Sequence, residues 1–212
     1  MKDFINSGGH HHIYSDLLAR LSSADIALSS HHLGLTLNAD AEAEIPFLRS
    51  KYLILRQGVR RSDGKKVPDA IGSVMIHYIL NGSPARPCGQ FVTLAELAGP
   101  LFKHSSYSAG ALEAPIVKRF QGRVPELLAI AESVGGHLGG EAGLGAVSLI
   151  LEMLPHIPLQ LIFYDRDEEF PARATLLYDA NAIKMIEFEV LAVLATVFVQ
   201  SLIKLHNYRG IT

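Results

Sequence analysis

This 212-residue chain has little cysteine and almost no net charge. Its one cysteine, Cys88, excludes an internal disulfide and an iron–sulfur cluster held by four thiolates of this chain alone. The 19 basic and 21 acidic residues leave a net charge of −2, which provides no electrostatic footprint for nucleic acid or for an anionic membrane. We therefore expect neither as a partner.

The chain also lacks a long hydrophobic run, a signal peptide and the common catalytic signatures. Its most apolar tract, residues 190–199, is about half of the ~20 residues that a spanning helix needs. Residues 1–6 lack the apolar core of a signal peptide, so we expect a cytoplasmic protein. No Gly-x-Ser-x-Gly, Cys-x-x-Cys, His-Glu-x-x-His or dinucleotide fingerprint is present, which disfavours common hydrolases, redox enzymes and dehydrogenases.

What the chain does have is ample apolar surface, since 49% of its residues are hydrophobic and 19% are charged. Helical and strand patterns alternate without a regular βαβ repeat, which predicts an α+β fold with a mixed, mostly antiparallel sheet packed by helices. We expect a flexible N-terminal segment over residues 1–12 and a single domain over residues 13–212. Predicted helices span residues 15–32 (one or two helices), 68–80, 94–97, 109–120, 124–134 and 187–205, and predicted strands span residues 43–48, 52–55, 90–92, 146–151, 159–164 and 174–178.

Two glycine and histidine patterns invite a ligand-binding interpretation. The glycine-rich residues 135–145 follow a helix and lack the Gly-Lys-Ser/Thr ending of a phosphate loop, so we interpret them as a connector. Among ten histidines, the adjacent His10, His11 and His12 are candidate metal ligands, although an N-terminal run of this kind also fits a tag. His77 lies beside the apolar stripe of its helix. Two roles fit this position: a hydrogen-bonding residue at the edge of the core, or an axial ligand to a tetrapyrrole.

An acidic turn between two predicted strands is the most informative segment. Four carboxylates lie within five residues, at positions 165, 167, 168 and 169. Such a group can bind a hard cation or share a proton, and the alternative is a solvated turn. Phe170-Pro171 fixes the exit from the turn, and a nearby arginine can pair with a carboxylate. The candidate binding residues are His77, Asp167, Glu168, Glu169 and Arg173.

Several short segments resemble, in order, a family of domains of unknown function found mainly in anaerobic bacteria and archaea. These segments are residues 47–54, 58–59, 67–68, 76–80, 91–97, 135–136, 154–159, 167–171 and 177–179. Some members of that family are joined to cysteine-rich iron–sulfur modules, which implies a setting in anaerobic redox or corrinoid-linked metabolism. This chain has no such module, so a cluster or corrinoid would be bound by histidines and backbone here or carried by a partner.

Three functions follow from these patterns. The first is a non-enzymatic accessory domain that binds a metal-containing cofactor, related to a tetrapyrrole or an iron–sulfur cluster, or that binds a redox or iron–sulfur protein partner. The second is an enzyme whose acidic-turn carboxylates hold a divalent metal or act as a general base. The third is a structural, partner-binding homodimer formed through the apolar closing helix.

Overall fold

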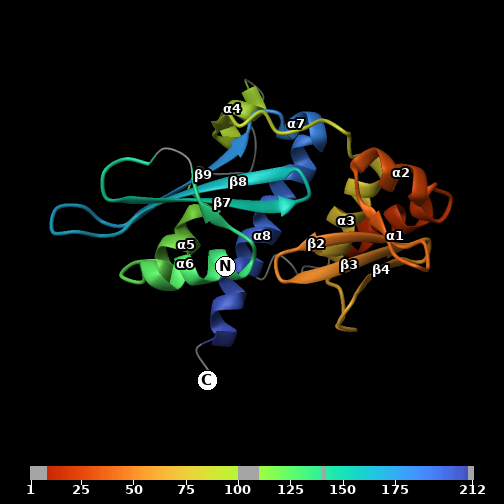
Figure 1. The fold of residues 1–212 in the computed structure, drawn as a ribbon, viewed down its shortest axis with the longest axis horizontal. Helices are drawn as coiled ribbons and strands as arrows, with labels where there is room; N and C mark the ends of the chain where they lie inside the picture. Colours follow the sequence, from red (N-terminus) through yellow and green to blue (C-terminus); the bar gives the residue numbers. More distant parts are fainter. Residues whose placement is uncertain (1–8, 100–109, 140–141, 210–212) are drawn as a thin grey trace. The chain divides into compact units, whose positions relative to one another are not determined.

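The computed structural model describes residues 9–99, 110–139 and 142–209, which form two compact units (Figure 1). Unit 1 comprises Met1–Arg86 and Ile183–Val197, and unit 2 comprises Pro87–Ala182 and Phe198–Thr212. Each unit contains helices and one sheet, so the predicted α+β class is confirmed. We expected one mixed sheet, whereas the described residues form two sheets in which every strand pair is antiparallel.

The sheet of unit 1 is a meander with the order β1-β2-β3-β4. The strands predicted over residues 43–48 and 52–55 form an antiparallel hairpin, and its cross-strand pairs Ala43↔Ile54 and Ile45↔Tyr52 place buried side chains on one face. The fourth strand was not predicted, because a glycine and two arginines leave it without an alternation of apolar and polar residues. Charged residues are nevertheless typical of an edge strand. The strands are β1 (Thr36–Leu37), β2 (Ala43–Phe47), β3 (Ser50–Leu55) and β4 (Gly58–Arg61).

Three helices belong wholly to unit 1: α1 (Gly9–Ser22), α2 (Ile26–Leu33) and α3 (Asp69–Asn81). Helix α2 begins at the cap Asp25 and ends at Gly34, whose φ of 70° suits the left-handed position after a helix. Helix α3 buries nine of its residues, and α1 packs against it. The two helices approach closely because Gly72 has no side chain, and a Cβ there would lie 2.5 Å from the Tyr14 ring.

The sheet of unit 2 has the order β5-β9-β8-β7-β6. The strands predicted over residues 146–151, 159–164 and 174–178 are present, and each extends beyond its predicted bounds. One face is buried and apolar, formed by Leu149, Leu151, Leu161, Phe163 and Leu176. The elements are β5 (Phe91–Val92), β6 (His137–Leu138), β7 (Ala146–Leu154), β8 (Ile157–Tyr164), β9 (Arg173–Asp179), α4 (Leu94–Ala98), α5 (Glu113–Phe120) and α6 (Val124–Ser133).

Helices α7 (Ala182–Met185) and α8 (Phe188–Arg209) contribute residues to both units. We expected the apolar tract in α8 to be too short to span a membrane. In the structure, however, Phe188–Leu205 is long and apolar enough to do so by length and composition alone, with a mean hydropathy of 1.8. Of that window, 56% is buried inside the protein, and the core helix of a soluble protein passes the same test. The spacing of Leu191, Leu194, Phe198, Leu202 and Leu205 predicts an apolar stripe on this helix; the first four are buried, and Leu205 is partly exposed.

Candidate functional site

The acidic turn joins β8 to β9 and is held rigid by its own backbone and by Asp167. Asp167 Oδ1 accepts hydrogen bonds from the N–H groups of Glu169 at 2.8 Å and Phe170 at 2.7 Å. The N–H of Asp167 donates to the carbonyl of Phe170 at 3.0 Å. These backbone hydrogen bonds hold the pKa of Asp167 below its usual value, because they favour the charged form. Asp167 therefore shapes the turn from within.

The next three side chains of the turn face solvent. Glu168 and Glu169 are exposed, and Phe170 keeps 66% of its surface in contact with solvent. A carboxylate site for a metal or a general base needs groups that converge in a cleft, whereas this turn is exposed. Across residues 9–99, 110–139 and 142–209, no group of three or more histidine, cysteine, aspartate or glutamate residues is placed to hold a metal ion.

Arg173 lies at the base of the turn and stacks on an aromatic ring. We expected that it could pair with a carboxylate of the turn, but its guanidinium carbon lies 3.9 Å from the centroid of the Tyr164 ring. The reason is the strand register, because Tyr164 and Arg173 are direct partners across β8 and β9. A cation in this position is attracted by the face of the ring. Arg173 thus contacts Tyr164 across the last residue pair of β8 and β9, next to the turn.

A second loop reaches the same end of the sheet. Because Ala146 pairs with Tyr164, the loop before β7 lies beside the acidic turn, and the two loops lie at the same end of unit 2 (Figure 1). A Cβ on Gly143 would lie 2.6 Å from the Tyr164 hydroxyl, so this loop runs against the base of the turn. The next residue, Leu144, is fully exposed. We refer to Leu144, Glu168, Glu169 and Phe170 together as the exposed tip.

His77 lies half-buried on α3, in a line of hydrogen bonds that fixes its proton. Arg20 donates to Asn81 Oδ1 at 3.0 Å, so the Asn81 amide group turns its NH₂ toward His77 Nδ1, 3.1 Å away. A guanidinium can only donate, so Nδ1 accepts and the neutral ring carries its proton on Nε2. Burial lowers the pKa of His77, Arg20 lowers it further, and Glu187 opposes the shift.

This arrangement matches one of the two roles expected for His77. A metal-bound histidine normally donates the proton of its second nitrogen to an acceptor. In His77 the second nitrogen accepts instead, as suits a hydrogen-bonding residue at the edge of the core. His77 belongs to unit 1 and the acidic turn to unit 2.

The N-terminal histidines begin helix α1, where the sequence predicted a flexible segment. His11 Nδ1 lies 3.1 Å from Asp69 Oδ2, which links α1 to the first turn of α3. The side chain of His12 is exposed, and its ring centroid lies 6.4 Å from that of His11. The side chain of His10 lies outside the described residues. Metal binding by this run stays a prediction.

The sequence drew attention to Asp179 only because it follows the strand after the acidic turn, and it did not predict that this carboxylate is buried at the end of β9. Asp179 is fully buried, and its Oδ1 accepts hydrogen bonds from the N–H groups of Cys88 at 3.1 Å and Asn181 at 2.9 Å. The Cys88 thiol also donates to Oδ1 at 3.4 Å, and the N–H of Gly89 donates to Oδ2 at 2.7 Å. Asp179 therefore anchors the loop before β5, and Cys88 is part of this anchor.

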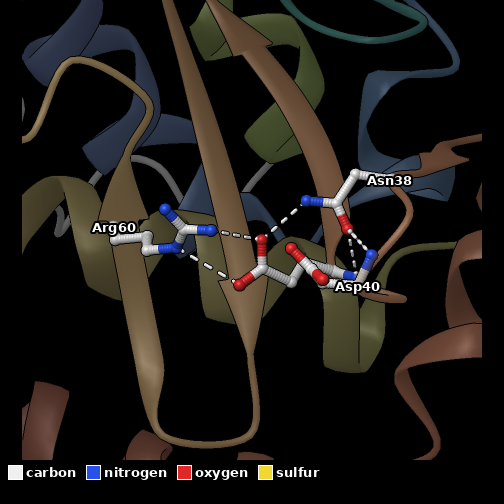
Figure 2. Close-up of polar contacts among 4 residues, drawn as sticks. Asn38, Asp40 and Arg60 are labelled. Carbon is white, nitrogen blue, oxygen red and sulfur yellow. Dashed lines mark hydrogen bonds and ion pairs between the residues drawn. The ribbon is translucent and has the colours of Figure 1, made fainter.

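The sequence also gave no sign of a cavity at one end of the unit 1 sheet. Its rim is stiffened by Glu42, which accepts two hydrogen bonds from the Arg60 guanidinium at 2.6 and 3.2 Å and one from Asn38 at 2.6 Å (Figure 2). These bonds, with Arg60 the largest cause, lower the pKa of Glu42. The cavity has a volume of about 370 Å³ and is lined by Asp25, Ile26, Ala27, Asp40, Ala41, Glu42, Leu55, Arg56 and Gln57.

Comparison with known proteins places the chain in a family. A comparison with curated proteins found no match, and a comparison with solved structures found none. A family model matches residues 25–201, which include most of both units. The chain therefore belongs to the family described as a domain of unknown function, DUF3786.

Proposed function

We propose that this protein is a non-enzymatic binding module whose exposed tip docks on a partner protein. The observation that carries the proposal is the state of Phe170, an aromatic side chain that stays 66% exposed on a turn fixed by three hydrogen bonds. Large exposed apolar groups commonly mark interaction sites, and aromatic residues are frequent anchors of interfaces. The rigid turn supports binding, because little conformational entropy is lost when the tip is buried.

The charges of the turn indicate the chemistry of the partner surface. Glu168 and Glu169 directly precede the aromatic anchor in the chain, and Asp167 adds a third carboxylate. We infer a partner with lysine and arginine residues around an apolar depression that accepts Phe170. Exposed charges of this kind act mainly on association rate and on partner choice, so the complex should weaken as salt concentration rises.

The partner that we propose is a cytoplasmic redox or iron–sulfur protein of anaerobic metabolism. Support comes from the resemblance to a family with members joined to iron–sulfur modules, together with the single cysteine of this chain. In this proposal the partner carries the metal-containing cofactor, and Glu168 and Glu169 are contact residues. The exposed position of the turn disfavours the alternative of a carboxylate-based enzyme, because such a site needs a cleft.

The experiment is capture of the partner from a native anaerobic lysate, followed by calorimetric titration of the purified partner. Burying a phenylalanine contributes about 1.5–3 kcal/mol, so Phe170→Ala should weaken binding by roughly 10- to 150-fold. The matched control is Leu28→Ala, which removes an apolar side chain of similar exposure, 53%, from unit 1. Unchanged affinity in Phe170→Ala, or in the triple variant with Asp167, Glu168 and Glu169 replaced by alanine, would contradict the assignment.

A homodimer is a separate proposal, and it gives a different result in the same samples. If the exposed tip pairs two copies of this chain, light scattering will show a dimer that Phe170→Ala dissociates. If the closing helix α8 forms the dimer, its mass will not depend on Phe170. A monomer at high protein concentration would exclude both forms of the dimer.

A further inference from the structure

The cavity of unit 1 is independent of the exposed tip, and it is built where three chain reversals meet. The turn between β1 and β2 and the turn between β3 and β4 lie at the same end of the sheet, because Ala43 pairs with Ile54. The start of α2 completes the wall. A volume of about 370 Å³ is within the range of ~300–1,000 Å³ that small-molecule pockets occupy.

Two of the charged groups in the wall already have partners. Glu42 is held by Arg60 and Asn38, and Asp25 Oδ1 accepts the N–H of Leu28 at 3.0 Å as the cap of α2. The other two charged side chains, Asp40 and Arg56, make no side-chain hydrogen bond or ion pair with the residues that the structure describes. They are of opposite sign and come from different turns.

The wall therefore offers one carboxylate and one guanidinium that make no hydrogen bond or ion pair with the described part of the chain, and Ile26, Ala41 and Leu55 add apolar surface to the same wall. The backbone of the turn at Asp40 is held by Asn38, whose Oδ1 accepts the N–H of Asp40 at 3.0 Å (Figure 2). A carboxylate attracts an ammonium group, and a guanidinium binds a carboxylate through two parallel hydrogen bonds. A ligand that uses both must carry both charges.

We propose that this cavity binds a small zwitterion, namely a free α-amino acid with a short apolar side chain or a dipeptide of such residues. Its ammonium group lies at Asp40 and its carboxylate at Arg56. The apolar part of the wall receives the side chain. Glu42 is paired with Arg60 and Asp25 caps α2, so the wall keeps one further carboxylate and one guanidinium; a ligand that carries both charges uses both groups, whereas a simple cation or anion uses only one.

The experiment is a titration of the ¹⁵N-labelled full-length protein, followed by amide chemical shifts. The probes are L-valine and L-alanyl-L-alanine, and the singly charged controls are acetate and methylammonium. We expect saturable shifts confined to the three turns with the zwitterions, and at least about tenfold weaker binding of each singly charged control. Asp40→Asn and Arg56→Gln should each weaken binding of the zwitterions by a similar factor.

Both substituted positions are exposed, and the unliganded spectra of the variants report whether the fold is retained. The matched control variants are Asp16→Asn and Lys66→Gln, which remove one charge of each sign from exposed positions outside the cavity. Absence of saturable shifts with both zwitterions would overturn the proposal. Equal binding of methylammonium or acetate would overturn it, as would unchanged affinity in Asp40→Asn and Arg56→Gln. Variants of the exposed tip should bind the zwitterion normally, so this proposal and the docking proposal can fail separately.

Discussion

Replacement of the buried carboxylate Asp179 by asparagine should destabilise unit 2 without disturbing its surface. In the native protein both oxygens accept hydrogen bonds, from the N–H groups of Cys88, Gly89 and Asn181 and from the Cys88 thiol. Asparagine has the same shape but only one acceptor oxygen. That oxygen is expected to take the Oδ1 position, where most of the donors meet, so the new NH₂ group faces the N–H of Gly89.

The cost can be worked out from these contacts. Hydrogen bonds to a charged group contribute about 1.5–3 kcal/mol and neutral ones about 0.5–1.5 kcal/mol, so the two retained backbone bonds together lose roughly 2 kcal/mol. The unpaired donor at Gly89 costs a further ~1–3 kcal/mol. Removing a buried charge recovers part of this loss, because the carboxylate no longer has to be desolvated. We therefore expect Asp179→Asn to lower the free energy of unfolding by about 2–4 kcal/mol.

The assay combines urea unfolding with hydrogen exchange of individual amides. The amides of Cys88, Gly89 and Asn181 should exchange much faster in Asp179→Asn, while those of α3 in unit 1 should change less. Asp165→Asn is the control, because Asp165 also accepts two backbone N–H groups, from Gly122 at 2.7 Å and Arg166 at 2.8 Å, but is not fully buried. A loss in Asp179→Asn no larger than the loss in Asp165→Asn would refute the reasoning.

Three further substitutions in α3 test other parts of unit 1. Gly72→Ala should lower the free energy of unfolding by about 1–2 kcal/mol, because the clash with Tyr14 outweighs the gain in helix propensity. Urea unfolding of Gly72→Ala, Tyr14→Ala and the double variant measures the interaction energy between the two positions. Ser73→Ala should raise that free energy by up to about 1 kcal/mol in the same assay, because the buried Ser73 hydroxyl has no hydrogen-bond partner among the described residues, and a loss of stability would reveal a partner. Burial lowers the pKa of His77, so its neutral form stabilises the fold above the ordinary histidine value of about 6.5, and stability falls as the pH drops below that value through the folded pKa. Urea unfolding between about pH 5 and 7 should therefore show a smaller loss for His77→Gln than for the native protein, and identical curves would contradict the assignment.

Local patterns in the sequence predicted the elements well where one period dominated. The helix around His77 and the three long strands of unit 2 follow clear apolar repeats, and the structure contains them. Strand β4 was missed because Arg60 and Arg61 fill positions where a buried strand has apolar residues, and its pairing with β3 compensates for the weak pattern. Periodicity also could not show that the strands form two sheets.

The candidate sites depended on contacts that no local pattern contains. Spacing identified the carboxylates of the acidic turn, but it could not show that Asp167 accepts hydrogen bonds from backbone N–H groups of the turn. The partner of Arg173 follows from the strand register. The cavity joins three turns that are separated in sequence, so it exists only once the sheet and α2 have formed.

The division of the chain into units has a consequence for anyone who wishes to dissect it. Unit 1 needs residues 183–197 as well as residues 1–86, so a fragment that stops at Arg86 lacks the buried Leu191 and Leu194. A fragment that starts at Pro87 keeps Leu191 and Leu194 but lacks residues 1–86, which belong to the same unit. Expression of either half alone should therefore give an insoluble or unfolded product.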